Sequence, residues 1–392
     1  MSRSVVLLCA FIFSNTFAVG AFPVLLPEMA GDGVISDFAL GAIAGAFGLA
    51  RLGADIPAGL FITHHLRRAL VLAAVSITAG VLCVTIGGPV WSLILGRILW
   101  GVGHSLVMVS GITAIVRHAR PGGHAVSLNA FEMSGMCGVL FGMVATGLLP
   151  RDWPWNLSLA LASSPLLVGL LLLPFVLRSV PTDHRAGLAR PLFSRLDHGG
   201  VRKPPGAVRP RVSLLTVLAV ASGASIAFAW SAVGQFILPL RASRDFELDR
   251  IGVASLVAVP QLVDVVSLLP LGAIADRTSR VKVLGWVLVI LAGGVAAVTF
   301  GSLPVAIIGC VLLGIGLAAW MLPVSLVNRD AEAGSVAWRT ALYRVAVDAG
   351  IFLGPVFSGF LLGHSLLGAV GAFVSAILAA LGIGLLLRYR TG

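Results

Sequence analysis

Charged residues and cysteines are both scarce in this chain. Only 11% of its 392 residues are charged, and 58% are hydrophobic. A soluble domain has about 25% charged residues, so this composition excludes a domain that is surrounded by water. The four cysteines lie in apolar runs without a C-x-x-C pair, which argues against a disulfide framework and a zinc site; they are Cys9, Cys83, Cys137 and Cys310. We expect neither a cofactor nor a bound metal.

The sequence motifs of enzymes and of ATP-driven pumps are absent as well. The chain has no GKS or GKT for a nucleotide phosphate, no GxSxG or HExxH for hydrolysis, and no HxxxxD of membrane acyltransferases. We therefore predict that the protein is not an enzyme. A non-transporting membrane receptor is a minor alternative at this point.

Long apolar runs, in contrast, recur along nearly the whole chain. Each has about 20 residues or more, enough for a helix to cross ~30 Å of hydrocarbon. The runs lack the period-two alternation of a transmembrane barrel, so we predict an all-α membrane protein. The twelve expected spans are residues 4–26, 37–62, 67–87, 89–116, 124–149, 155–178, 213–240, 250–275, 281–301, 303–327, 337–363 and 365–387.

Residues 179–212 interrupt this pattern, because they hold seven arginines and lysines, several prolines and no apolar run. We interpret them as a basic cytoplasmic linker. The chain then divides into an N-terminal six-helix bundle, residues 1–178, and a C-terminal six-helix bundle, residues 213–392.

The net charge of +11 is concentrated in alternate loops. Basic residues gather near Arg67 and Arg68, near Arg117 and Arg120, in the linker and in "DRTSRVK" (276–282). The positive-inside rule places these loops in the cytoplasm, and an even number of spans places both termini there too. We expect a multi-pass protein of the plasma (inner) membrane. Its partners would be the lipid bilayer, protons and a small-molecule substrate, without nucleic acid.

The two predicted bundles resemble each other at one loop. "DIPAGLFITHHLRR" (55–68) ends the second span, and "LLPLGAIADRTSRVK" (268–282) ends the eighth. The second stretch contains a complete Gly-x-x-x-Asp-Arg-x-x-Arg-x-Lys signature, with Gly272, Asp276, Arg277, Arg280 and Lys282. The first stretch keeps Gly59, Arg67 and Arg68, but has Thr63 and His64 at the Asp and Arg positions of the signature.

With this loop motif and "LILGRILWGVG" (93–103) in the fourth span, the chain resembles the major facilitator superfamily over essentially its full length. The resemblance implies a monomer with two six-helix bundles that works by alternating access, in the branch of proton-coupled drug and metabolite antiporters. It implies that span two packs on span eleven, and span five on span eight. It also links Arg97 to proton coupling.

Four charged residues are expected to form a gate between the two bundles. Arg51 and Asp55 lie four residues apart in the second span, as do Arg344 and Asp348 in the eleventh. If the two spans face each other, every charge in this group can be paired. Losing one partner of a buried pair costs roughly 3–5 kcal/mol. Such a group would therefore stabilise one arrangement of the two bundles, and would release it when the charges find new partners as the bundles move. The alternative is two separate salt bridges, each within its own helix.

Two further acids, Glu132 in the fifth span and Asp264 in the eighth, have no basic residue within one turn on their own helices. Two carboxylates near each other in a low dielectric cannot both be charged cheaply. We predict that Asp264, Glu132 and Arg97 form the proton-coupling site. The alternative is that one of the acids pairs with Arg97 or extends toward water.

A substrate cavity is expected between the spans that the resemblance places at the centre, namely one, four, seven and ten. Arg97, Gly101, His104 and Met108 share one face of the fourth span. The predicted lining is Asn15, Thr16, Arg97, His104, Met108, Trp230, Gln235 and Trp320. Such a lining suits an amphipathic ligand, and an anionic one would find its counter-charge in Arg97.

Together these features predict a secondary active transporter that exports a small amphipathic compound in exchange for protons. The alternative is proton-linked uptake of an organic anion or nutrient. Copper transport is a minor alternative, because methionines and Cys137 follow one another at helical spacing in the fifth span.

Overall fold

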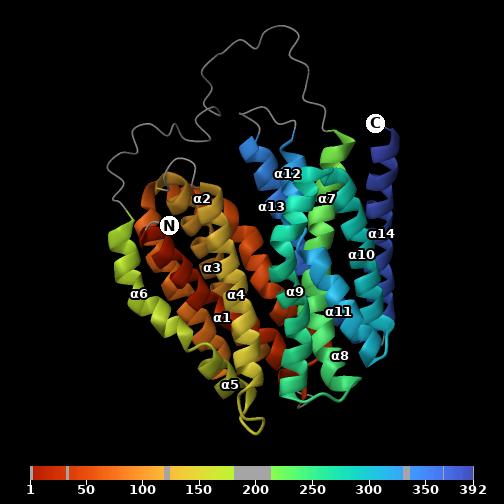
Figure 1. The fold of residues 1–392 in the computed structure, drawn as a ribbon. Helices are drawn as coiled ribbons and strands as arrows, with labels where there is room; N and C mark the ends of the chain where they lie inside the picture. The colour runs from red at the N-terminus through yellow and green to blue at the C-terminus, as the bar shows by residue number, and fades with distance from the viewer. Residues whose placement is uncertain are drawn as a thin grey trace.

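The protein is described by a computed structural model that covers residues 3–31, 35–118, 124–180, 213–329, 336–364 and 366–391. Within these ranges its regular structure is helical (Figure 1). The first helices are α1 (Arg3–Gly31), α2 (Asp37–Ile86), α3 (Val90–His118), α4 (His124–Gly147), α5 (Trp155–Ala162) and α6 (Pro165–Ser179). They are followed by α7 (Leu214–Ala229), the π-helix η1 (Trp230–Ile237), α8 (Leu238–Arg244), α9 (Arg250–Arg277), α10 (Arg280–Phe300), α11 (Leu303–Leu317), α12 (Met321–Val327), α13 (Val336–Leu362) and α14 (Leu367–Thr391). Nearly all of the predicted linker, residues 181–212, lies outside the described ranges.

Eleven helical segments of the described ranges are long and apolar enough to cross a membrane, so the chain is a multi-pass membrane protein. The sequence predicted twelve spans. The difference arises at α2, a 50-residue helix that covers both expected spans 37–62 and 67–87. His65 interrupts it with φ −135° and ψ 44°, at the boundary that the sequence indicated.

Three expected spans are not continuous α-helices. The span at 155–178 is divided into α5 and α6 just before Pro165, whose ring nitrogen has no hydrogen to donate to the preceding turn. The span at 213–240 consists of α7, η1 and α8, and the span at 303–327 consists of α11 and α12. The apolar pattern locates these spans but contains no signal for the breaks within them.

The helices pack in a few main pairs. Helix α2 contacts α3, α1 contacts α4, and α10 contacts both α11 and α14. Two further pairs, α2 with α13 and α4 with α9, join segments that come before the linker to segments that come after it. These two are the neighbour pairs that the family resemblance implies.

Two ends of the molecule can be distinguished in Figure 1. At the upper end α7 begins and α14 finishes; at the lower end α4 passes into α5 and α8 turns into α9. Helices α2 and α13 touch through glycines toward the lower end. A Cβ atom added to Gly41 would lie 2.4 Å from the Pro355 carbonyl oxygen, and one added to Gly359 would lie 2.5 Å from that of Asp37. Only glycine allows this close approach of the two backbones.

Candidate gate and coupling residues

Four charged side chains meet where α2 packs on α13. Arg51 Nη2 lies 2.8 Å from Asp348 Oδ1, and Arg344 Nη2 lies 2.6 Å from Asp55 Oδ2. Both ion pairs therefore cross from one helix to the other. The i,i+4 spacing on each helix places an acid and a base on the same face, so each charge finds its partner on the opposite helix. We call these four residues the charge cluster.

The two ion pairs of the charge cluster differ in how well their carboxylates are hydrogen-bonded. Arg344 Nε also donates to Asp55 Oδ2 at 2.7 Å, and the Ser105 hydroxyl of α3 donates to Asp55 Oδ1. Asp348 is only 1% exposed, yet its Oδ1 receives no N–H in hydrogen-bond geometry from any described residue. The 2.8 Å contact of Arg51 with Asp348 is thus an attraction of charges without an aligned hydrogen bond. This is the less well satisfied pair of the two.

His104 and Glu132 lie beside the charge cluster. His104 of α3 interacts electrostatically with Arg51 and Asp55, and its ring centroid lies 5.3 Å from that of Phe47. Glu132 of α4 interacts electrostatically with Arg344 and Arg51. Helices α3 and α4 thus add an imidazole and a third carboxylate to the region where α2 meets α13.

Asp264 of α9 has a different environment. Its side chain is only 8% exposed, and its Oδ1 accepts no hydrogen bond from the described residues. No electrostatic interaction between Asp264 and Glu132 is found in the described ranges. Glu132 thus interacts with the arginines of the charge cluster, whereas no charged partner of Asp264 is found among the described residues. That the two acids form one coupling site stays a prediction, and the helices that carry them, α4 and α9, pack on each other.

Arg97 of α3 is enclosed by aromatic rings. Its guanidinium carbon lies 3.9 Å from the ring centroid of Phe22, 4.8 Å from that of Trp100 and 4.9 Å from that of Phe47. Nη2 donates to the Ala44 carbonyl at 3.3 Å, while Nε and Nη1 have no partner among the described residues. Arg97 therefore has no acidic partner among the described residues, so the alternative in which one of the two acids pairs with Arg97 is not seen here. Cation–π contacts hold its charge instead.

The residues expected to line a cavity fall into two groups. Asn15 and Thr16 are buried in helix packing: Asn15 Nδ2 donates to the Phe11 carbonyl at 2.7 Å, and Thr16 Oγ1 to the Gly135 carbonyl of α4 at 2.9 Å. Met108, Trp230, Gln235 and Trp320 are half-buried. Trp230 and Gln235 both belong to η1, and π-helical turns occur frequently at functional sites. This second group is the better candidate for contact with a substrate.

The loop motif is at the upper end and carries mostly exposed charges. Asp276 Oδ1 pairs with Arg280 Nη2 at 2.9 Å, four residues away, and Arg277 is exposed. In the first copy, Arg67 donates from Nε and Nη2 to the Val180 carbonyl, at 2.9 and 2.6 Å. A Cβ atom added to Gly59 or Gly272 would meet nothing within 4 Å. Each motif copy is thus bound within its own part of the chain.

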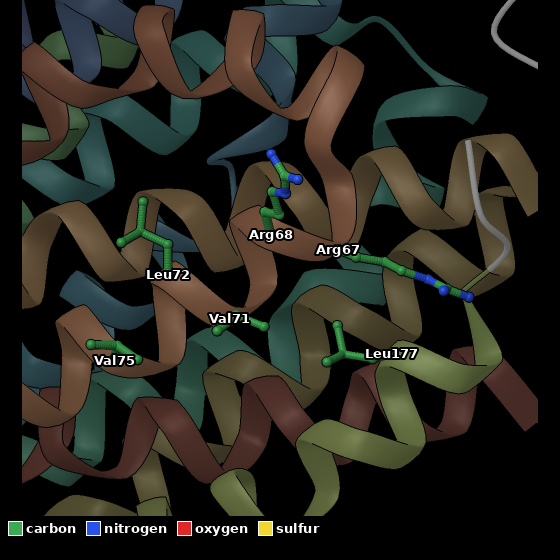
Figure 2. Close-up of a pocket in the computed structure, with 6 residues that line it drawn as sticks. All are labelled: Arg67, Arg68, Val71, Leu72, Val75 and Leu177. Atoms are coloured by element: carbon green, nitrogen blue, oxygen red, sulfur yellow. The ribbon is translucent and has the colours of Figure 1, made fainter. Parts of the chain in front are cut away.

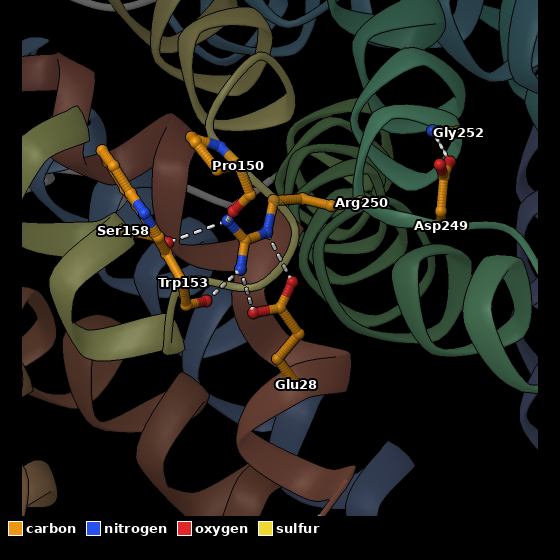
Figure 3. A network of polar contacts seen from close by, with 7 residues as sticks. All are labelled: Glu28, Pro150, Trp153, Ser158, Asp249, Arg250 and Gly252. Carbon is orange, nitrogen blue, oxygen red and sulfur yellow. Dashed lines mark hydrogen bonds and ion pairs between the residues drawn. The ribbon is translucent and has the colours of Figure 1, made fainter.

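Arg250 forms a site that the sequence analysis missed (Figure 3). It is the first residue of α9, is 5% exposed and binds both carboxylate oxygens of Glu28 on α1, at 2.6 and 2.7 Å. It also donates to the carbonyls of Pro150 and Trp153, at 2.6 and 2.7 Å, and to the Ser158 hydroxyl at 2.8 Å. We call these five residues the Arg250 network. It joins α9 to α1, to α5 and to the turn after α4, all at the lower end.

The sequence held only a weak signal for the Arg250 network. Glu28 and Arg250 are separated by 222 positions, and three of the acceptors are a hydroxyl and two backbone carbonyls, which no charge pattern reveals. A second lower-end ion pair, between Arg244 Nη2 of α8 and Asp37 Oδ1 of α2 at 2.7 Å, also links distant parts of the chain. At the lower end, distant parts of the chain are therefore joined by two ion pairs and by the glycine contacts of α2 with α13.

Comparison with known proteins agrees with this architecture. The family model described as Major Facilitator Superfamily matches residues 7–237. No curated protein matches the chain. A crystal structure of a mutant of the peptide transporter POT in complex with alafosfalin is 14% identical, with a TM-score of 0.77 over 100% of this chain and 95% of that chain.

Two further solved structures are similar over nearly their whole length. A mutant of the nucleoside transporter NupG is 13% identical, with a TM-score of 0.73 over 98% of this chain and 99% of that chain. A bacterial homologue of the human lysosomal transporter Spinster, in an inward-facing and occupied conformation, is 15% identical, with a TM-score of 0.69 over 98% and 94%. At such identities the likeness establishes the fold alone.

Proposed function

We propose a mechanism of transport from one premise: the chain belongs to the major facilitator superfamily, whose model matches more than half of it. The protein is accordingly a transporter and not an enzyme. We propose that it is a secondary active transporter with two six-helix bundles, residues 1–178 and 213–392, that rock about a central substrate site. On this proposal α2 counts as two spans, because a helix of 50 residues is about 75 Å long, more than twice the hydrocarbon thickness.

The observation that carries the proposal is the pair of ion bridges between α2 and α13. Each bridge joins the proposed N-terminal bundle to the C-terminal one, and Asp348 and Asp55 are buried while Arg344 is 34% exposed. Separating a buried pair without replacing its partner costs roughly 3–5 kcal/mol. The bundles would therefore move apart here only when substrate or a proton compensates the charges. This is the behaviour required of a gate.

We further propose that the upper end faces the cytoplasm. The exposed basic residues Arg68, Arg277 and Arg280 lie there, as the positive-inside rule requires of cytoplasmic loops. Both termini then lie in the cytoplasm of a cell whose plasma membrane holds the protein. The structure would represent the state in which the outer end is closed by the Arg250 network.

For the coupling ion we propose a proton, carried by Asp264. The Asp264 side chain is buried and its Oδ1 has no hydrogen-bond partner among the described residues, so its charge is costly, and binding a proton removes that charge. Glu132 would respond to gate movement, because its attraction to Arg51 and Arg344 depends on how far apart α2 and α13 are. The proposed cargo is a small amphipathic compound near Trp230, Gln235 and Trp320, and the proposed direction is export. A single chain contains both bundles, so the proposed working unit is a monomer.

The test is flux in proteoliposomes under an imposed pH gradient, with a panel of amphipathic dyes and organic anions. Arg51→Asp and Asp348→Arg, each alone, should reduce flux at least tenfold, because each leaves two like charges facing each other. The double charge swap should restore a substantial part of it. Proton-driven movement of a dye away from the cytoplasmic side supports export. Proton-driven uptake of an anion would instead support the alternative function, transport into the cell. Equal flux in all four proteins would remove the charge cluster from the mechanism.

A further inference from the structure

A groove of about 330 Å³ lies between α2 and α6, near the upper end of the molecule (Figure 2). Its walls are formed by Val71, Leu72 and Val75 of α2 and by Leu177 of α6, with Arg67 and Arg68 at one end. The three α2 side chains are open to the surroundings, and Val75 is 57% exposed. This part of the surface faces outward, away from the charge cluster between α2 and α13.

The groove has a cationic end and an apolar floor on a single helix face. Residues 68, 71, 72 and 75 follow the spacing i, i+3, i+4, i+7, which places them on one side of α2. The stripe extends about 10 Å along the helix axis, at 1.5 Å per residue. It begins just after the kink at His65, where α2 starts its second passage from the upper end.

The two arginines at the groove differ in their contacts. Arg67 donates twice to the Val180 carbonyl and thereby holds the end of α6 against α2, which fixes the distance between the groove walls. Figure 2 shows Arg68 leaving α2 in another direction. Arg68 is exposed and makes no hydrogen bond or ion pair with a described residue. Its guanidinium, with five N–H donors, is therefore available to an outside partner.

The surroundings of the groove favour an anion over a neutral group. The lining contains no acidic residue, and Arg178, next to Leu177 in sequence, adds a further exposed positive charge on α6. A water-soluble anion would satisfy the arginines but would leave the apolar floor without a contact. A molecule that joins an anionic head to a hydrocarbon chain complements both parts.

We propose that this groove binds an anionic phospholipid, with its phosphate-bearing head group at Arg68 and one acyl chain along Val71, Leu72, Val75 and Leu177. This proposal rests on the orientation proposed above, in which the upper end of α2 meets the head groups of the cytoplasmic leaflet, where basic residues attract anionic lipid. The bound lipid links α2 to α6 directly below the kink at His65. The site lies on the outer face of the molecule, so it does not depend on the proposed gate.

The experiment uses the full chain in detergent and native mass spectrometry, with phosphatidylglycerol and phosphatidylcholine of identical acyl chains. We expect phosphatidylglycerol to be retained preferentially. Arg68→Gln should lower its retention about fivefold, which corresponds to the loss of one cationic contact at a membrane surface. Arg68→Lys should retain most of the binding. Leu72→Trp, which fills the apolar floor, should reduce the retention of both lipids.

Arg277→Gln is the matched control, because Arg277 is an exposed arginine at the same end and does not line the groove. It should leave the retention of phosphatidylglycerol unchanged. Inorganic phosphate in a thermal-shift assay distinguishes the lipid from a simple anion, and we expect no stabilisation by phosphate. Equal retention of both lipids by the unmodified protein, the same loss in Arg277→Gln as in Arg68→Gln, or stabilisation by phosphate alone would each overturn the proposal.

Discussion

Asp264 shows how much depends on the surroundings of a single carboxyl group. It sits in the middle of α9, 14 positions after Arg250, and has neither a basic partner nor a hydrogen bond to its Oδ1 among the described residues. Other acids of the structure are neutralised by arginine: Asp55 by Arg344 and Glu28 by Arg250. The described residues thus leave the charge of Asp264 without a compensating partner, and a proton is the simplest means of compensation.

Asp264→Asn keeps the size of the side chain and removes its ability to release a proton. We expect flux to lose its dependence on the pH gradient by tenfold or more, while exchange of substrate between equal pools continues. The measurement compares flux in proteoliposomes with and without the gradient.

Asp249→Asn is the control for this substitution. It changes the same residue type on the same helix, at the N-cap position, where Asp249 Oδ1 accepts from the Gly252 amide and asparagine caps equally well. It should retain the gradient dependence. Asp264→Asn with an unchanged gradient dependence would assign the proton to another group, with Glu132 the next to be tested.

At the residue scale, the sequence allowed prediction of those contacts that follow from one helix. The spacing of Arg51 and Asp55, and of Arg344 and Asp348, defines one face on each helix, and the family resemblance supplied the facing helix. Arg97 could not be treated in this way. Its neighbours Phe22 and Phe47 come from two other helices, and aromatic rings in an apolar span give no signal that they surround a cation.

At the scale of elements, α2 connects the two parts of the chain on either side of the linker. It packs along α3 in its own part of the chain and along α13 in the other part. A Cβ atom added to Gly48 would lie 2.5 Å from the Phe352 backbone nitrogen of α13, whereas one added to Gly53 on the same helix would meet nothing within 4 Å. The absence of a side chain is thus required at one of these positions and not at the other.

Gly48→Ala should therefore destabilise the protein, because the backbone of α13 cannot move aside as a flexible side chain would. Overpacking of this kind costs about 1–3 kcal/mol, so we expect the unfolding temperature of the purified protein to fall by several degrees. Gly53→Ala should raise it slightly, since alanine favours the helix by about 0.5–1 kcal/mol over glycine. A fall of equal size in both variants, measured in the same thermal scan, would show that close packing on α13 is not the cause.

The elements themselves were predictable from hydropathy, because a span has to be apolar over about 20 residues. Their interruptions were predictable only in part, since Pro165 marks the break within 155–178 but other breaks have no comparable signal. Nothing in the apolar run at 213–240 distinguishes the π-helical turn η1 from regular α-helix, and the kink at His65 occurs without a proline or glycine at that position. These breaks depend on how neighbouring helices fill space, which a single sequence does not state.

For the whole molecule, the lower end is the place where the two proposed bundles are most firmly joined. Glu28→Gln keeps the shape of the side chain but removes the charge that opposes the buried Arg250 guanidinium. The Arg250 side chain is only 2% exposed, so the loss of its counter-charge is costly, and we expect the lower end to open in a larger fraction of molecules.

Spin labels report this opening as a distance. They can be attached at Leu148→Cys in the proposed N-terminal bundle and at Asp245→Cys in the proposed C-terminal bundle, in a background without the native cysteines. The native side chains at these positions are 71% and 45% exposed. Glu28→Gln should add or enlarge a population at longer distance. Asp152→Asn, an exposed acid in the same turn, is the control and should leave the distribution unchanged; an unchanged distribution in Glu28→Gln as well would contradict the role of the Arg250 network.

Arg250 has a consequence for how this opening can proceed. Its five hydrogen bonds use all five N–H donors of one flat guanidinium group, and their acceptors are spread over α1, the turn after α4 and α5. A planar group cannot tilt toward one acceptor without leaving the rest. The five hydrogen bonds of Arg250 should therefore break together. We expect the lower end to open over a single high barrier and not through a series of partly open forms.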